Sequence, residues 1–258
     1  MVRLSLLWGL GLVLIPLIAL QGWWVRRKAL RLGPADGPMT GTVTVLEAPS
    51  DASFALTEEV PAGARARDRS GARLLGLGDS VIAGVGIENT TLSLVPQVAL
   101  RWRPDTVSHV DWQIRAEDGA TLTDAIRLLK DGVKGQFDVV IISVGVNDVT
   151  RLTSLVKWQS LLMLLIARLR DHSPDATLVF LMVPPMDRFP MLPQPLRAML
   201  GIRAAMLNRV LGWVIGAHQG VIGVDLATEF DASLLATDGY HPNARAIEEI
   251  ADVIVAAL

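Results

Sequence analysis

From Arg73 to the end of the chain, short and almost continuous apolar runs alternate with longer segments in which apolar residues recur at helical spacing. Such runs predict buried strands, and the longer segments predict helices that cover them. The expected strands are 73–78, 107–114, 137–144, 177–183 and 221–226, and the expected helices lie near 91–102, 121–133, 152–171 and 196–217 and after residue 241. The pattern therefore predicts a doubly wound α/β domain whose parallel sheet is covered on both faces.

The N-terminal segment has a different pattern, because residues 4–25 contain no charged side chain. About 20 apolar residues are enough for a helix to span a bilayer, and Trp23 and Trp24 stand where interfacial aromatic residues are expected. We predict an uncleaved transmembrane anchor rather than a cleaved signal peptide, since no Ala-x-Ala site follows the run. A buried core helix is the third alternative, and the lack of a polar face argues against it.

Basic residues follow this apolar segment directly: Arg26, Arg27, Lys28 and Arg31. Because basic flanks favour the cytoplasm, we predict that the rest of the chain lies on the cytoplasmic side of the membrane; an exported domain on the periplasmic side is the alternative. Residues 1–31 then form the anchor with its basic flank, 32–70 a linker rich in Gly and Pro, and 71–258 the α/β domain. Within the linker, 42–48 has the alternation of a short strand.

The overall composition excludes several classes of function. The 258 residues carry 24 basic and 26 acidic side chains, a balance that gives no sign of a nucleic-acid partner. Cysteine is absent, which excludes disulfides, a cysteine nucleophile and thiolate metal sites. The four histidines are far apart in the sequence, and GLGDSV lacks the third glycine of a dinucleotide loop. We therefore expect no metal and no organic cofactor.

Four short motifs lie at the carboxyl ends of predicted strands or directly before a helix: GDS at 78–80, EDGAT around Gly119, GVND at 145–148 and DGYH at 238–241. Ligands bind at this edge of a parallel α/β sheet. Each motif also has an ordinary structural explanation, namely a turn that contains a serine, a tight glycine turn, an Asx turn and a helix-capping loop. No motif identifies a function by itself.

The side chains in these motifs nevertheless suit acyl-transfer chemistry. Asp238 and His241 are three residues apart, so that the imidazole Nδ1 can bind the carboxylate and Nε2 remains free to face a hydroxyl. The Asn147 amide and the backbone N–H of Gly119 can donate to a developing oxyanion. Ser80 becomes a useful nucleophile only if such a base accepts its proton.

Taken together, and in this order, the four motifs resemble those of the SGNH/GDSL hydrolase family, over about residues 73–258. The resemblance implies that Ser80 is the nucleophile, that His241 is the general base and then the general acid, and that Asp238 orients His241. It also implies an oxyanion hole made by the N–H groups of Ser80 and Gly119 and by the side chain of Asn147. The fold it implies is a flavodoxin-like, three-layer α/β/α arrangement with a five-stranded parallel sheet, and no cofactor.

The reaction that this resemblance implies is hydrolysis of an ester or thioester through an acyl-serine intermediate. Our hypothesis is a membrane-anchored serine esterase that acts on a small-molecule or lipid acyl ester. A thioesterase, a lysophospholipase, a carbohydrate O-deacetylase and an acyltransferase of the same fold are the alternatives, because fold and triad do not specify the leaving group. A membrane-tethered binding module with a vestigial triad is the alternative from another class.

The segment after the fourth predicted strand, residues 184–200, is rich in proline and carries the apolar side chains of Met186, Phe189 and Met191. Adaptable apolar side chains at the active-site edge can line an acyl pocket, whereas an ordinary loop packed on a helix would explain them equally well. Two aspartates beside the motifs, Asp79 and Asp148, are expected to hydrogen-bond to neighbouring turns rather than to take part in catalysis. Arg151 is expected to be a surface charge.

Overall fold

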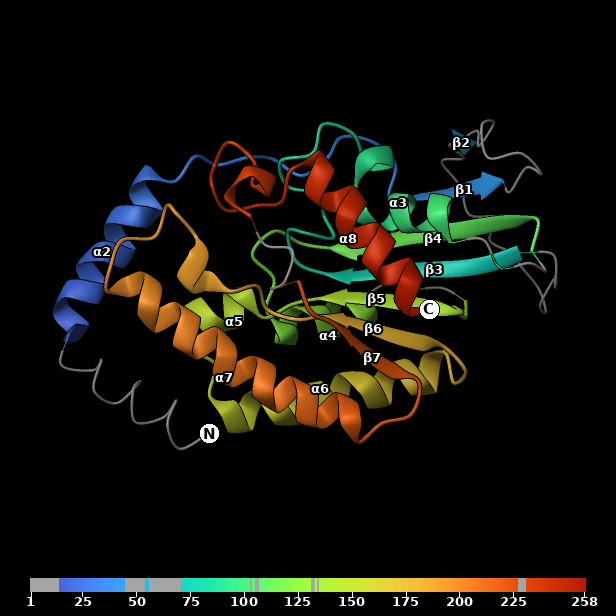
Figure 1. Ribbon diagram of the computed structural model, residues 1–258. Helices are drawn as coiled ribbons and strands as arrows, with labels where there is room; N and C mark the ends of the chain where they lie inside the picture. The colour runs from blue at the N-terminus through green and yellow to red at the C-terminus, as the bar shows by residue number, and fades with distance from the viewer. Residues whose placement is uncertain are drawn as a thin grey trace.

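The described residues form one sheet of seven strands in the order β2-β1-β4-β3-β5-β6-β7 (Figure 1). The structure is a computed structural model, and it describes residues 14–44, 54–55, 71–102, 104, 107–130, 133, 135–226 and 231–258. The strands are β1 (Thr40–Thr44), β2 (Phe54–Ala55), β3 (Gly71–Gly78), β4 (His109–Ala116), β5 (Val139–Ser143), β6 (Thr177–Leu181) and β7 (Val221–Val224).

Five of these strands form the predicted parallel sheet. The order β4-β3-β5-β6-β7 places the first parallel strand between the second and the third, which is the flavodoxin-like order. All five residues of β5 are buried, as expected for a central strand covered on both faces. The predicted fold class is thus confirmed for the α/β core.

The sheet is wider than predicted, because β1 and β2 extend it antiparallel at the β4 edge. The strand expected at 42–48 lies at 40–44 instead, inside the predicted linker 32–70. Gly41 of β1 fits there because a Cβ atom at this position would come within 2.5 Å of the ring of Trp112. Part of the predicted linker therefore belongs to the sheet, while 45–53 and 56–70 lie outside the described residues. The exact domain limits stay a prediction.

The helices cover the two faces of the sheet in separate groups. One face carries α3 (Leu94–Arg101) and α8 (Ala244–Ala257), and the other carries α4 (Leu122–Lys130), α5 (Val146–Thr150), α6 (Leu155–His172) and α7 (Leu196–Gly216). Short 3-10 turns lie at Thr90–Leu92, Met186–Arg188 and Ala232–Leu234. The helix predicted over 152–171 starts later, because Ser154 accepts from the N–H of Lys157 at 3.2 Å and caps α6.

The N-terminal helix α2 (Ile15–Lys28) does not support the predicted transmembrane span of residues 4–25. Its 14 residues make about 21 Å of helix, less than the ~30 Å of a bilayer core, and the part of the span before Leu14 lies outside the described residues. The carboxamide of Gln21 instead attaches α2 to the start of α7: it donates to Gln194 O at 2.6 Å and accepts from the N–H of Leu196 at 3.1 Å.

Within the part of the chain that the structure describes, α7 is the one helix whose length and composition would allow it to cross a membrane. It packs against α6 and contributes Leu207 and Leu211 to the core below the sheet, so core packing accounts for its apolar character.

Candidate active site

The turn after β3 carries Ser80 at the carboxyl edge of the sheet. Gly78 ends the strand with φ +147, and a Cβ atom there would lie 1.9 Å from the carbonyl oxygen of Ser143 on β5, so only glycine fits. The N–H of Asp79 then donates to that same oxygen at 3.0 Å, and the carbonyl of Ser80 accepts from the N–H of Val85 at 2.9 Å. Ser80, 8 % exposed, is thereby held in a tight turn that faces a cavity.

The turn before α8 carries Asp238 and His241. Oδ2 of Asp238 lies 2.6 Å from Nδ1 of His241, and Oδ1 accepts from the backbone N–H groups of Tyr240 and His241 at 2.9 and 3.0 Å. Burial opposes ionisation of this carboxyl, but the hydrogen bonds from His241 and Tyr240 outweigh it and hold the pKa of Asp238 below its ordinary value. An ionised Asp238 fixes the proton of His241 on Nδ1, which leaves Nε2 as the basic nitrogen.

The structure brings these two turns together at one cavity of about 280 Å³. Ser80, Tyr240 and His241 all line it, although Ser80 and His241 are far apart in the sequence. The ring of Tyr240 meets that of His241 edge-on at 5.3 Å and limits how the imidazole can rotate. The nucleophile and the base predicted from the motifs therefore lie on the same surface.

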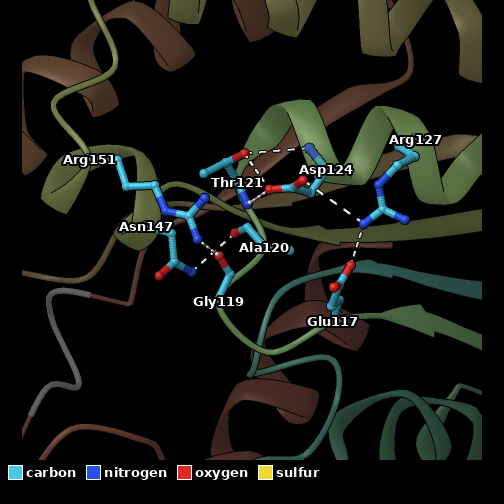
Figure 2. A network of polar contacts seen from close by, with 8 residues as sticks. All are labelled: Glu117, Gly119, Ala120, Thr121, Asp124, Arg127, Asn147 and Arg151. Carbon is cyan, nitrogen blue, oxygen red and sulfur yellow. Dashed lines mark hydrogen bonds and ion pairs between the residues drawn. The ribbon is translucent and has the colours of Figure 1, made fainter.

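Gly119 and Asn147 lie side by side at this edge, as Figure 2 shows. Gly119 has φ +76, a conformation that favours glycine. The Nδ2 of Asn147 donates to the carbonyl of Ala120 at 3.1 Å; since an amide nitrogen carries two protons, the second remains for a ligand. Among the described residues, the N–H groups of Ser80 and Gly119 have no acceptor. Three donors are thus available for an oxyanion.

Arg151 is exposed, as expected of a surface charge, and it also contacts the Gly119 turn. Its guanidinium donates to the carbonyl oxygen of Gly119 at 3.0 Å (Figure 2). The bond ties the Gly119 turn to the residue that follows α5. The sequence shows only that Arg151 lies six residues after Gly145, next to the GVND motif. Its contact with Gly119, which is 32 residues away in the chain, could not be predicted from that position.

Asp79 and Asp148 bind neighbouring turns, as predicted. Oδ1 of Asp79 accepts from the hydroxyl of Ser143 at 2.8 Å and from the N–H of Val81 at 3.3 Å. Asp148 accepts from the N–H of Leu122 at 2.9 Å and from the Thr153 hydroxyl at 2.8 Å. Burial raises the pKa of both carboxyls, that of Asp79 to about 7. They connect the motif turns to the adjacent strand and helix.

The loop after β6 separates two hollows. Phe189 is buried, tilts against Tyr240 at 5.2 Å and lines the cavity of Ser80. Met186 and Met191 face a larger groove of about 760 Å³, which also contacts Asp238, Asn147 and α2. The three predicted substrate-binding residues thus lie near the site, on different sides of Tyr240. Within the described residues, no group of three His, Asp or Glu side chains is placed to hold a metal ion.

The model of the GDSL-like lipase/acylhydrolase family matches residues 77–246. Several solved structures have a similar fold. The carbohydrate esterase family 2 enzyme of Corynascus thermopiles (Myceliophthora fergusii) is 17 % identical, with a TM-score of 0.58 over 80 % of this chain and 68 % of that chain. The lipase/acylhydrolase of Enterococcus faecalis is 23 % identical, with a TM-score of 0.56 over 72 % and 94 %.

An extracellular lipase of Streptomyces rimosus is 20 % identical, with a TM-score of 0.52 over 72 % of this chain and 98 % of that chain. At these identities the likeness shows the fold alone. No curated protein is similar enough to this chain to count as a match.

Proposed function

The chain belongs to the GDSL-like lipase/acylhydrolase family, and we propose that it is a membrane-attached serine esterase that cleaves acyl esters through an acyl-serine intermediate. One observation carries the proposal. His241, joined to Asp238 at 2.6 Å, lines the same cavity as Ser80. A serine beside a histidine whose other nitrogen is bound to a carboxylate is the arrangement that activates a hydroxyl for attack on a carbonyl.

In the proposed reaction, Oγ of Ser80 attacks the ester carbonyl carbon while Nε2 of His241 accepts the hydroxyl proton. The carbonyl oxygen becomes an oxyanion and receives hydrogen bonds from the N–H groups of Ser80 and Gly119 and from the second amide proton of Asn147. The intermediate collapses, the C–O bond breaks, and His241 returns its proton to the leaving alcohol. A water molecule, deprotonated by His241, then hydrolyses the acyl-serine and frees the acid.

Membrane attachment through the N-terminal segment, with the catalytic domain on the cytoplasmic side, is part of this proposal. The exposed apolar side chains on the outer face of α2 support it, among them Leu17, Leu20 and Trp24. Three cations, Arg26, Arg27 and Lys28, end this helix. A reporter fused to the C-terminus tests the orientation, because activity only in an exported reporter would reverse it.

The reaction is tested with the full chain and its Ser80→Ala variant on p-nitrophenyl esters from acetyl to palmitoyl. We expect a burst of p-nitrophenol and steady turnover from the wild type, and neither from the variant. A fluorophosphonate probe should label Ser80 in the wild type alone. If the wild type hydrolyses no ester in the series and Ser80 is not labelled, the esterase proposal is wrong, and a tethered binding module becomes the better explanation.

A further inference from the structure

The larger of the two hollows, which we call the α2 groove, runs between α2 and the segment 191–200 and reaches the catalytic turn. Its volume of about 760 Å³ lies within the usual range of ligand sites, whereas the Ser80 cavity has about 280 Å³. Tyr240 and His241 line both hollows. A ligand in the α2 groove therefore lies against the base of the proposed triad.

One wall of the groove is α2 itself. Ile18, Gly22 and Val25 face the groove and are half-buried, at the spacing of one helix face. The carboxamide of Gln21 fixes α2 to the start of α7. The wall is thus held by specific contacts.

The chain after α2 is attached directly to the segment that follows the nucleophile. The carbonyl of Gly33 accepts from the N–H of Gly86 at 3.1 Å, and the N–H of Ala35 donates to the carbonyl of Ala83 at 3.2 Å. The N–H of Thr90 donates to Asp36 O at 2.8 Å. Hydrogen bonds therefore hold the middle of α2 to α7, and they hold the chain that follows α2 to the segment after Ser80.

The chemistry of the groove changes along its length. The wall opposite α2 is apolar and consists of Met191, Leu192, Leu196 and Met199. The two methionines among them are flexible and can adapt to a ligand. Asn147 and His241 lie at the catalytic end. Most of a ligand in this space would lie against hydrocarbon, and the cations Arg26 and Arg151 also line the groove.

We propose that the α2 groove binds the alkyl chain of a long-chain ester, with the N-terminal helix as one wall of the substrate site. This inference rests on the proposed esterase function and adds the class of substrate. The family match begins at residue 77, so the wall is a feature of this chain outside the matched domain. Each methylene that the groove buries contributes about a fourfold gain in binding.

Gly22→Leu is the sharpest test, because Gly22 faces the groove and a Cβ atom there meets nothing within 4 Å. The leucine fills space that a substrate chain would occupy, and it suits a helix better than glycine. Gly212→Leu is the matched control: Gly212 lies exposed in α7, its Cβ position is equally open, and it is not part of the groove.

Two series of esters are assayed with the full chain in phosphatidylcholine vesicles. One series is p-nitrophenyl esters from acetyl to palmitoyl, and the other is acetate esters of alcohols from ethanol to hexadecanol. In the series whose chain enters the groove, Gly22→Leu blocks three or four methylenes. The ratio of long-chain to short-chain kcat/KM then falls about a hundredfold. The ratio in Gly212→Leu equals that of the wild type.

A second variant, Ile18→Ala, keeps the test decisive if Gly22→Leu fails to fold. Ile18 is half-buried on the same wall, and removing its side chain exposes the bound chain to water, so the ratio falls about fourfold. If the wild type is active and neither variant changes the ratio in either series, the inference is wrong while the esterase stands. If the wild type cleaves no ester and Ser80 is not labelled, both proposals fail together.

Discussion

Two aspartates lie in turns at the carboxyl edge of the sheet, Asp79 beside Ser80 and Asp238 three residues before His241. Both are buried, with exposed fractions of 2 % and 9 %. Asp79 accepts from two uncharged donors, the hydroxyl of Ser143 and the N–H of Val81, and burial raises its pKa to about 7. Asp238 accepts from two N–H groups and from the imidazole, and its pKa is lowered despite burial.

The difference shows that closeness to the nucleophile does not make a carboxylate catalytic. Asp79 is adjacent to Ser80 in the sequence, but its hydrogen bonds go to β5 and to its own turn. Asp238 is distant in the sequence, but it lies 2.6 Å from Nδ1 of His241, where the proposed mechanism needs a carboxylate to set the tautomer and to stabilise the imidazolium. Groups that touch the reacting atoms or their base should therefore change kcat strongly, and groups that hold the backbone should change it little.

Asp238→Asn is expected to have the largest effect. An amide at this position can present its N–H₂ group to Nδ1 and so favour the tautomer with the proton on Nε2, where His241 cannot act as a base. We expect kcat to fall about 10³-fold or more. Burst kinetics on p-nitrophenyl butyrate measure it, with Asp79→Asn as the matched control. Equal losses in the two variants would contradict the distinction between the two carboxylates.

Asn147→Ala comes next, because it removes one donor to the oxyanion. Such a donor typically contributes ~3 kcal/mol to the transition state. We expect kcat to fall about 10²-fold with a smaller change in KM. Asn147 also binds the carbonyl of Ala120 at 3.1 Å, so thermal unfolding of the variant must be measured alongside. An unchanged kcat in a folded variant would remove Asn147 from the mechanism.

The sequence predicted the features that depend on local patterns and missed those that depend on contacts between distant residues. The parallel strands and the helices could be predicted because apolar periodicity is a local property, and the motif residues because each motif follows a strand end or precedes a helix. A short strand was expected at 42–48, but within a linker and not within the sheet, since TGTVT lies among glycines and prolines and its pairing with β4 spans about 70 residues. The attachment of α2 through Gln21 and of Gly119 through Arg151 depends on the folded chain and leaves no local pattern.

Arg151→Ala is expected to have a smaller effect than Asn147→Ala. The guanidinium of Arg151 holds the carbonyl of Gly119 at 3.0 Å and so positions the N–H of that residue. We expect kcat to fall about tenfold, since a misplaced donor is weakened rather than lost. Arg151→Lys keeps one donor at this place and should recover part of the loss, whereas a merely structural role would change thermal stability without this rescue.

Asp79→Asn should have the smallest effect on activity, at most about twofold in kcat, because the hydrogen bonds of this carboxyl go to Ser143 and Val81 and not to His241. Its effect is expected on stability instead. With a pKa of about 7 in the folded chain against 3.8 as the ordinary value, the folded state binds one more proton than the unfolded state between these limits. The free energy of unfolding of the wild type therefore falls as the pH rises from about 4 to about 7.

Asparagine carries no charge at any pH, so Asp79→Asn removes this dependence. Near pH 4 the wild type holds a neutral Asp79, and the two proteins differ only through the different hydrogen bonding of the amide. At pH 8 the wild type must hold a buried negative charge, which costs up to about 4 kcal/mol because burial raises the pKa of Asp79 to about 7. The melting temperature of the variant minus that of the wild type should rise by about 5 °C or more between pH 4.5 and 8. A difference that stays constant with pH would mean that Asp79 is ionised throughout, and the contrast with Asp238 would then lie in geometry alone.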